Sequence, residues 1–304
     1  MDAPAVRVEK LVKKYGPLTA VDGLDLEVRR GECFGLLGPN GAGKTTTVEI
    51  LEGLNDRTSG EVEVLGLRWE TDEKALRQRL GISLQETHLP DRLTVEENLR
   101  VFRSFYAQGP DVEEVLSLVE LTDKRHSWTE KLSGGQKQRL AVACALVGDP
   151  EVLFLDEPTT GLDPQSRRQL WDVVLGFKAR GRTVLLTTHY MDEAERLCDR
   201  VAVIDQGKVI ALGTPAELIA GLGGHEIVEL ATRDPLRPEE LLDLPGVRGA
   251  RRSADGIALT VEQLHLALPA VLLRVESRGL SRLATHRATL EDVFVHLTGR
   301  KLRE

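Results

Sequence analysis

The chain has 304 residues, of which 41% are hydrophobic and 29% are charged, and its formal net charge is −8 with a pI near 5.5. This is ordinary globular composition, with enough length for one large core and a small second domain. The acidic balance argues against a nucleic-acid binder, and no stretch approaches the roughly 20 consecutive apolar residues that span a bilayer.

The N-terminal part of the chain predicts strands followed by a phosphate loop. Residues 6–30 are expected to form two short strands around a Gly-Pro turn, and the apolar run Cys33 to Leu37 is expected to form a buried strand. The next segment fits the pattern of Gly, four residues, then Gly-Lys-Ser/Thr. It consists of Gly38, Pro39, Asn40, Gly41, Ala42, Gly43, Lys44 and Thr45, and a helix is predicted from about Gly43 to Leu54.

The residue types in this loop are those that phosphate binding requires. Glycines let backbone N–H groups turn toward phosphate oxygens, and the helix N-terminus adds about half a positive charge. Lys44 is expected to reach the β and γ phosphates, and the Thr45 hydroxyl is placed to bind Mg²⁺. The phosphate-loop residues that are expected to contact the nucleotide run from Gly38 to Thr46. The alternative is a glycine-rich loop that matches by accident, and the flanking strand and helix disfavour it.

Helical periodicity is predicted for most of the next segment. After a strand at residues 60–66, the pattern from about Asp72 to Arg125 is helical, and Thr94 and Glu97 form a capping box. Another helix begins after Leu132-Ser133-Gly134-Gly135-Gln136 and runs to Val147. The exposed N–H groups at its start predict a second anion site. The chain then has two phosphate sites.

Two acidic residues and a histidine follow later apolar strands. Asp156 and Glu157 stand where the strand at residues 152–155 emerges. Asp156 would face Mg²⁺ through water, and Glu157, pointing to the other side of the strand, could address the attacking water. Alone, this pair would indicate a solvated turn, but beside a phosphate loop it predicts ATP hydrolysis. His189 follows the strand at residues 183–187, where a structural histidine is an equal alternative.

Together these segments resemble the ATP-binding subunits of ABC transporters. The resemblance rests on residues 132–136, which look like the signature motif of that family, and it covers about the first 220 residues. It implies that Tyr15 stacks on adenine and that Gln85 lies between two subdomains. It also implies that Asp163 and His189 complete the nucleotide site. For Tyr15, a surface aromatic packed beside the Gly-Pro turn remains an alternative.

The resemblance further implies a head-to-tail homodimer. The signature of one subunit would close on the ATP held by the other, so that Ser133 and Gly135 contact the γ-phosphate of the partner's nucleotide. The expected catalytic residues are Glu157, His189 and Gln85, the expected Mg²⁺ ligands are Thr45, Gln85 and Asp156, and the expected nucleotide contacts are Tyr15, Gly38, Pro39, Asn40, Gly41, Ala42, Gly43, Lys44, Thr45, Thr46, Ser133, Gly134, Gly135, Gln136 and Asp163.

A small accessory domain is predicted over residues 225–304. Strands at 225–231, 247–252, 256–261 and 280–286 and helices at 237–244 and 263–278 would give the β-α-β-β-α-β order of a split βαβ unit. The tail from Thr289 to Arg300 resembles that of ATPases from bacterial drug and antibiotic exporters of the daunorubicin-resistance type. The alternative is an amphipathic helix that buries Leu290, Val293, Phe294 and Leu297 in the core.

The predicted fold class is therefore α/β, a phosphate-loop NTPase of the ABC type. Alternating strands and helices after Gly135 indicate a mostly parallel core sheet, accompanied by an antiparallel β subdomain. The ATP-binding domain is expected at residues 1–220, with a helical subdomain at about 86–145. The α+β domain would follow it.

The predicted function is hydrolysis of ATP for a bacterial exporter of a drug, antibiotic or lipid-like substrate. A separate transmembrane subunit would form the channel, and the chain would sit at the cytoplasmic face of the cell membrane, without nucleic acid. The alternatives are a soluble ABC ATPase acting on ribosomes or DNA, the ATPase of an importer, and a non-enzymatic binder. Three scattered cysteines suggest neither zinc nor disulfides and fit a reducing cytosol, and no export signal is expected.

Overall fold

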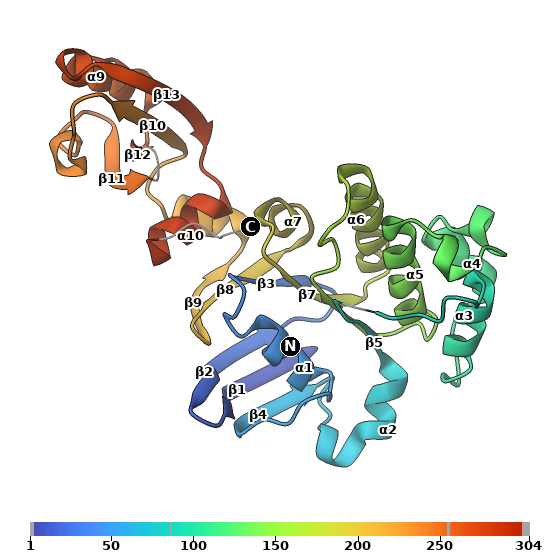
Figure 1. Ribbon diagram of the computed structural model, residues 1–304. Helices are drawn as coiled ribbons and strands as arrows, with labels where there is room; N and C mark the ends of the chain where they lie inside the picture. Colours follow the sequence, from blue (N-terminus) through green and yellow to red (C-terminus); the bar gives the residue numbers. More distant parts are fainter. Residues whose placement is uncertain (1–2, 86, 254–255, 300–304) are drawn as a thin grey trace. The chain divides into compact units, whose positions relative to one another are not determined.

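The computed structural model describes residues 3–85, 87–253 and 256–299 (Figure 1). It divides into two compact units, Met1–Leu212 and Gly213–Glu304. The boundary expected at about residue 220 differs from this division, because helix α8 (Pro215–Ala220) packs on elements of the second unit. Arg300, the last residue of the C-terminal motif, lies outside the described residues.

An antiparallel sheet of three strands opens the first unit. Its order is β2-β1-β4, with β1 at Val6–Tyr15, β2 at Leu18–Val28 and β4 at Ser59–Val64. Val8 and Leu11 of β1 are both buried, although a regular strand would place residues three apart on opposite faces. A bulge between them, with Lys10 at φ 49°, restores Leu11 to the inner face.

A sheet of six strands forms the centre of the same unit. Its order is β5 (Leu80–Ser83), β6 (Val152–Asp156), β7 (Thr183–Thr188), β3 (Cys33–Leu37), β8 (Arg200–Asp205) and β9 (Lys208–Gly213), and the first five strands pair in parallel. Strands β3, β6 and β7 are buried along their whole length, as expected for the central strands of a parallel sheet. Since parallel strands end at one edge, the segments that follow β3, β6 and β7 meet there.

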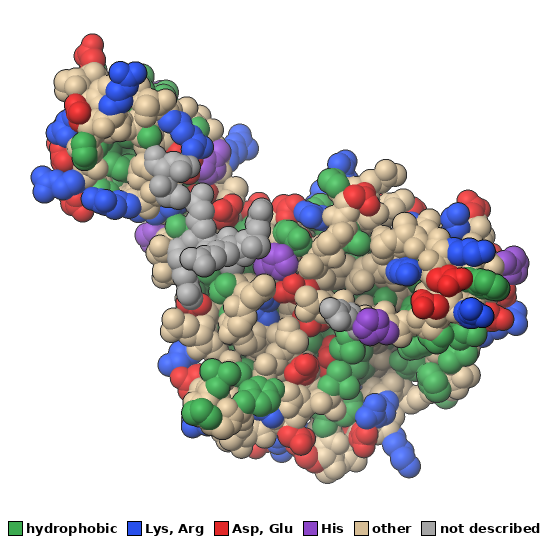
Figure 2. All heavy atoms as spheres, viewed as in Figure 1, with side chains coloured by type: hydrophobic (Ala, Val, Ile, Leu, Met, Phe, Trp, Pro, Cys, Tyr) green, Lys and Arg blue, Asp and Glu red, His purple; other side chains and the backbone are tan. Residues whose placement is uncertain are grey.

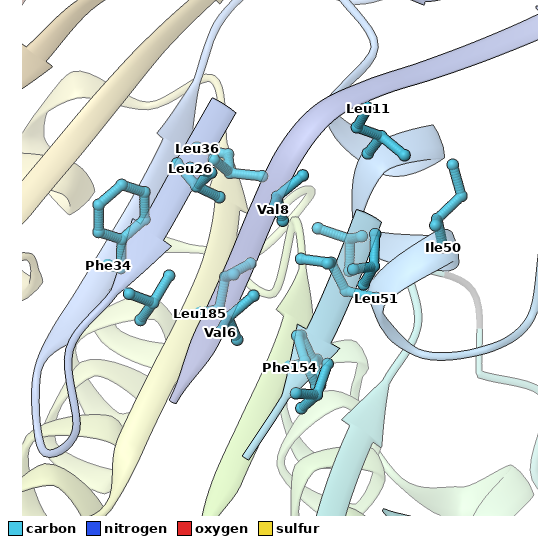
Figure 3. Packing of buried hydrophobic residues seen from close by; sticks show 14 of the residues in the cluster. Val6, Val8, Leu11, Leu26, Phe34, Leu36, Ile50, Leu51, Phe154 and Leu185 are labelled. Carbon is cyan, nitrogen blue, oxygen red and sulfur yellow. The ribbon is translucent and has the colours of Figure 1, made fainter. Parts of the chain in front are cut away.

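The core of the first unit lies between the two sheets. Figure 3 shows Val6 and Leu26 of the antiparallel sheet in one cluster with Phe34, Phe154 and Leu185 of the central sheet. Burying a side chain such as Phe154 stabilises the fold by roughly 1.5–3 kcal/mol. This packing fixes the ends of β3 and β6, from which the phosphate loop and the acidic pair emerge.

In the part of the first unit that the structure describes, seven helices accompany these sheets. They are α1 (Lys44–Leu51), α2 (Trp69–Arg79), α3 (Val95–Arg103), α4 (Val112–Leu118), α5 (Gly134–Leu146), α6 (Pro164–Ala179) and α7 (Met191–Leu197), with 3-10 turns at Thr122–Lys124 and Thr129–Lys131. The capping box of Thr94 and Glu97 begins α3, as predicted. The helical pattern expected from Asp72 to Arg125 is wrong at β5. That strand is too short for its sequence to show alternation. Its Gly81 packs closely against the chain at Ala145, because a Cβ at Gly81 would lie 2.2 Å from the carbonyl oxygen of Ala145.

The second unit is a four-stranded antiparallel sheet with helices. Its strands are β10 (Glu226–Thr232), β11 (Val247–Ser253), β12 (Gly256–Val261) and β13 (Leu280–Arg287) in the order β11-β12-β10-β13, and its other helices are α9 (Leu264–Val275) and α10 (Leu290–Thr298), with a 3-10 turn at Glu276–Arg278. The helix expected at 237–244 is instead a 3-10 turn, Pro238–Leu241. The Pro245-Gly246 pair that follows prevents its extension.

Helix α10 buries most of the side chains that its sequence predicted. Leu290, Val293 and Phe294 are buried, whereas Leu297 is 43% exposed and Val295 is buried instead.

On the face drawn in Figure 2, basic and acidic side chains are interspersed, as 40 Lys and Arg beside 48 Asp and Glu would lead one to expect.

The division at Leu212 predicts independent folding. A chain that ends at Leu212 should retain a cooperative thermal transition and native far-UV circular dichroism, because it keeps its own buried cluster intact. A matched chain that ends at Ala220 adds α8 without its packing partners and should be no more stable. Non-cooperative melting of the shorter chain would contradict this division.

Candidate functional site

The loop between β3 and α1 is fixed by close backbone packing. Gly43 has φ 100°, and a Cβ there would lie 2.4 Å from the carbonyl oxygen of Ala20. A Cβ at Gly38 would lie 2.2 Å from the carbonyl oxygen of Ile204. Larger residues at these two positions would therefore displace the loop. As the N-cap of α1, Gly43 offers no side-chain acceptor to the N–H groups of the first turn.

These N–H groups lie beside a cavity of about 410 Å³. Its lining is Tyr15, Leu18, Thr19, Ala20, Asn40, Gly41, Gly43, Lys44, Thr45, Thr46, Gln85 and Glu157. The structure thus brings together the predicted aromatic residue, the phosphate loop, the glutamine between subdomains and one of the two acids. Tyr15 is 44% exposed, and its hydroxyl accepts a hydrogen bond from Asn55.

The ammonium group of Lys44 is buried and has three acceptors. It donates to the carbonyl oxygens of Gly38 at 2.9 Å and Pro39 at 3.2 Å, and it lies 3.4 Å from Oε1 of Glu157. Lys44 is 4% exposed and Glu157 8% exposed. Burial lowers the pKa of Lys44, while the Glu157 carboxylate opposes that shift.

Asp156 stands at the end of β6 and is held by two hydroxyl groups. Thr187 and Thr45 both donate to Oδ1, the latter at 3.3 Å. Burial raises the pKa of Asp156, although both hydrogen bonds lower it. The oxygens of Thr45 and Asp156 are close enough to share one ion, and Gln85 lines the same cavity.

This donor set fits Mg²⁺. The ion prefers hard oxygen ligands, and proteins commonly hold it with one or two carboxylates while the substrate phosphates supply further ligands. Within the described ranges there is no group of three or more His, Cys, Asp or Glu side chains that could hold a metal alone. Thr45 and Asp156 would therefore act together with a bound triphosphate.

Glu157 adopts a backbone conformation that is uncommon for a residue with a side chain. Its φ is 45°, and such left-handed positions cost on the order of 1–3 kcal/mol. The backbone N–H of Glu157 donates to the hydroxyl of Thr187 at 2.9 Å, which holds the strained turn. Glu157 was expected to continue the strand and so to point to the side opposite Asp156. That expectation is wrong, because β6 ends at Asp156 and Glu157 begins a turn.

The carboxylate of Glu157 joins three segments. Oε1 faces Lys44, and Oε2 accepts from the Thr160 hydroxyl at 3.2 Å. Nδ1 of His189 lies 3.0 Å from the same Oε2. The ring of Tyr190 packs beside the imidazole, with centroids 4.2 Å apart. His189 thus approaches the carboxylate that was expected to polarise water.

The signature segment does not join this cavity within one chain. Of the residues that the structure describes, Ser133–Gln136 and Asp163 are not among those that line it. Ser133 and Gln136 form a capping box at the start of α5, so the N–H of Gln136 is already bonded to the Ser133 hydroxyl. The free N–H groups expected at this helix start are therefore fewer than predicted.

Asp163 has a structural role in this chain. It caps α6, accepting from the N–H groups of Gln165 at 2.9 Å and Ser166 at 3.0 Å. The Ser166 hydroxyl lowers the pKa of Asp163 by donating to it. Its carboxylate is thus committed to its own helix, and direct nucleotide contact from the same chain is not supported.

Relatives are similar over the whole length of the chain. A family model described as ABC transporter matches residues 21–160. The chain is 41% identical to Nod factor export ATP-binding protein I of Paraburkholderia xenovorans (strain LB400), with 100% of both chains covered. It is also 41% identical to the protein of the same name from Rhizobium meliloti (strain 1021), over 99% of this chain and 90% of that one. The chain belongs to the ABC transporter family.

Solved structures agree with this assignment. An ATP-binding subunit of an ABC transporter superposes with a TM-score of 0.66 at 29% identity, covering 72% of this chain and 93% of that one. The dimeric structure of MJ0796, a bacterial ABC transporter cassette, gives a TM-score of 0.61 at 27% identity, covering 69% of this chain and 98% of that one. ABC cassettes bind ATP and work as dimers with membrane permeases. Within the described residues, none of the helices has the length and apolar run that crossing a bilayer requires.

Two threonines of the site were missed by the sequence analysis. Thr187 connects the Asp156 carboxylate with the Glu157 backbone, and Thr160 donates to the Glu157 side chain. The pairs Thr159-Thr160 and Thr187-Thr188 were visible beside the acidic pair and the histidine. A threonine hydroxyl next to a predicted catalytic residue is the sequence feature that could have identified Thr187 and Thr160.

Near this site, Glu52 predicts a pH-dependent stability. It is 2% exposed, neither carboxylate oxygen has a hydrogen-bond partner among the described residues, and burial raises its pKa to about 8 from 4.5. Between these pH values the folded state retains a proton that the unfolded state loses. The free energy of unfolding should therefore fall as pH rises, by up to roughly 1.4 kcal/mol for each pH unit.

Glu52→Gln should remove this dependence, because an amide does not ionise. In urea denaturation at pH 6 and at pH 8, the stability of the variant relative to wild type should increase with pH. Equal relative stability at both pH values would contradict the raised pKa.

Proposed function

We propose that this chain is the ATP-hydrolysing subunit of a bacterial exporter, working as a homodimer at the cytoplasmic face of the cell membrane with a separate transmembrane subunit. The observation that carries the proposal is the convergence of Lys44 and His189 on the carboxylate of Glu157 beside a phosphate loop. A nucleotide-binding protein without hydrolysis has no need of that carboxylate.

Binding of the triphosphate would change the partners of Lys44. Phosphate oxygens compete with Glu157 for the buried ammonium group, and a triphosphate carries more negative charge than a single carboxylate. Mg²⁺ beside Thr45 and Asp156 would neutralise charge on the same phosphates. The side chain of Glu157 would then be released from its ion pair.

Glu157 would next act on water. Its Oε2 accepts from the Thr160 hydroxyl, which restricts its orientation, and lies 3.0 Å from Nδ1 of His189. The carboxylate would take a proton from the water as its oxygen bonds to the γ-phosphorus. The bond from the γ-phosphorus to the bridging oxygen would break, so that ADP and phosphate leave, and His189 would support the γ-phosphate. Tyr15 would stack on adenine at the other end of the cavity.

A second subunit would complete each site. The signature segment lies apart from the cavity in its own chain, and a solved cassette similar to this one is dimeric. In a head-to-tail pair, Ser133 and the free N–H groups at the start of α5 would face the γ-phosphate of the partner's ATP. ATP would hold the dimer together, and hydrolysis would release it.

Export is favoured over the alternatives by the relatives. They are named for Nod factor export, and they match this chain from end to end. The segment from Thr289 resembles the tail of drug and antibiotic exporters of the daunorubicin-resistance type. Hence a drug, antibiotic or lipid-like substrate is the proposed cargo, selected by the membrane subunit.

Replacing the proposed base should separate binding from turnover. Glu157→Gln should retain ATP binding but lower kcat by about 10² to 10⁴, because the amide cannot accept the proton of water. The measurements are phosphate release and equilibrium binding of a fluorescent ATP analogue. More than half the wild-type rate would remove Glu157 from this role.

Mixing two inactive variants tests the composite site. Ser133→Arg blocks the signature, and Lys44→Ala disables the phosphate loop, so each pure homodimer should be inactive. A heterodimer retains one site with Lys44 from one subunit and Ser133 from the other. ATPase activity should therefore exceed that of either pure variant. Activity no higher than that of the pure variants would count against shared sites.

A further inference from the structure

Gly135 of the signature segment is buried against helix α6, which lies beside α5 (Figure 1). A Cβ on Gly135 would lie 2.3 Å from Oγ of Ser166 and 2.6 Å from its Cβ, which is closer than a real Cβ approaches another atom. The preceding Gly134 differs, since a Cβ there would meet nothing within 4 Å. The start of α5 therefore rests on Ser166 at a position where only glycine fits.

Ser166 is itself held by Asp163, the residue that caps α6. Its hydroxyl donates to Oδ2 of Asp163 at 2.6 Å, and its N–H donates to Oδ1 at 3.0 Å. The shorter distance is typical of a charge-assisted bond from a hydroxyl to a carboxylate. Two bonds to one carboxylate leave the side chain little freedom to rotate. The oxygen against which Gly135 packs is thus fixed by the start of α6.

This contact determines what Gly135 can offer to a phosphate. Ser166 occupies the side on which a Cβ would stand, so the group left for an anion is the backbone N–H of the first helical turn. The capping box fixes the shape of that turn, because Gln136 and Ser133 exchange hydrogen bonds at 3.0 and 3.3 Å. The contact with Ser166 fixes the place of the turn relative to α6.

The place of such a donor affects the rate of a reaction. Donors aimed at charge that develops in a transition state must be positioned beforehand, and a displacement of about 1 Å can cost on the order of 10²-fold in rate. The donor in question would act on ATP that another subunit holds. The contact between Ser166 and Gly135 lies within one chain, and it would be felt across the dimer.

We propose that Ser166 is a positioning residue for ATP hydrolysis, which sets the place of Gly135 so that the signature of one subunit meets the ATP held by the other. This inference rests on the proposed function and its head-to-tail dimer. Ser166 itself contacts no nucleotide. Because it acts through the signature, its effect falls on the partner's site. An effect through Asp163 on the loop of Glu157 would fall on the site of its own chain instead.

The test places Ser166→Ala in either half of the mixed dimer of full-length Lys44→Ala and Ser133→Arg subunits. The one intact site of that dimer takes its signature from the Lys44→Ala subunit and its phosphate loop from the Ser133→Arg subunit. Ser166→Ala removes the hydroxyl oxygen beside Gly135, and alanine suits a helix.

Gln165→Ala is the matched control in the same turn of α6. The Gln165 side chain is exposed, and its removal keeps the backbone N–H that donates to Asp163 at 2.9 Å. All mixtures are assayed for phosphate release at saturating ATP and at equal subunit concentrations. Binding of a fluorescent ATP analogue to each subunit alone is measured in parallel.

Ser166→Ala should lower the ATPase rate about tenfold when the Lys44→Ala subunit carries it, because the signature donors are then displaced. The rate should stay within about twofold of the parent mixture when the Ser133→Arg subunit carries it, since the signature of that subunit is already blocked. ATP binding to the latter subunit should be unchanged. Gln165→Ala in the Lys44→Ala subunit should match the parent mixture.

A loss of the same size in both placements, or a loss confined to the Ser133→Arg subunit, would overturn the inference. If melting shows that Ser166→Ala does not fold, Ser166→Cys takes its place in both halves, because the larger sulfur crowds Gly135. A parent mixture no more active than the pure variants would defeat the shared site and this inference with it. An active parent mixture that is insensitive to Ser166→Ala would defeat this inference alone.

Discussion

The site depends on one buried cation, the ammonium group of Lys44. A desolvated ammonium must be matched by acceptors, and here they are two carbonyl oxygens of the phosphate loop and one carboxylate oxygen of Glu157. These acceptors come from the ends of β3 and β6. The ion pair therefore connects the element that would hold phosphate with the element that would activate water. A change of partner at Lys44 would affect both elements.

The parallel sheet provides the geometry for this connection. In its register, Asp156 is the partner of Thr187, and Thr187 is also the partner of Leu36 in β3. The three strand ends are thus neighbours before any side chain is considered. The strained turn at Glu157, held by Thr187, then directs the carboxylate toward Lys44 and His189.

Local sequence was sufficient for the parts of the site that depend on short segments. The phosphate loop, the acidic pair and His189 are each defined by a few consecutive residues after an apolar strand, and the structure places all three at one edge of the sheet. The capping box at Thr94 and the strands of both units other than β5 and β9 were predicted for the same reason. Such features are encoded by nearest neighbours along the chain.

Features that depend on distant segments could not be predicted. Strand β5 is defined by its pairing with β6, and its four residues carry no pattern of their own. Trp171 of α6 donates to Glu193 of α7, and only the folded chain brings these two helices together.

The exchange of partners at Lys44 is the central claim, and a crystal structure with Mg²⁺ and a non-hydrolysable ATP analogue tests it most directly. The account predicts that Nζ of Lys44 binds phosphate oxygens and has left Oε1 of Glu157, while Oε2 remains beside His189. A structure in which the analogue is bound and Nζ still lies near the 3.4 Å distance from Glu157 seen here would contradict it.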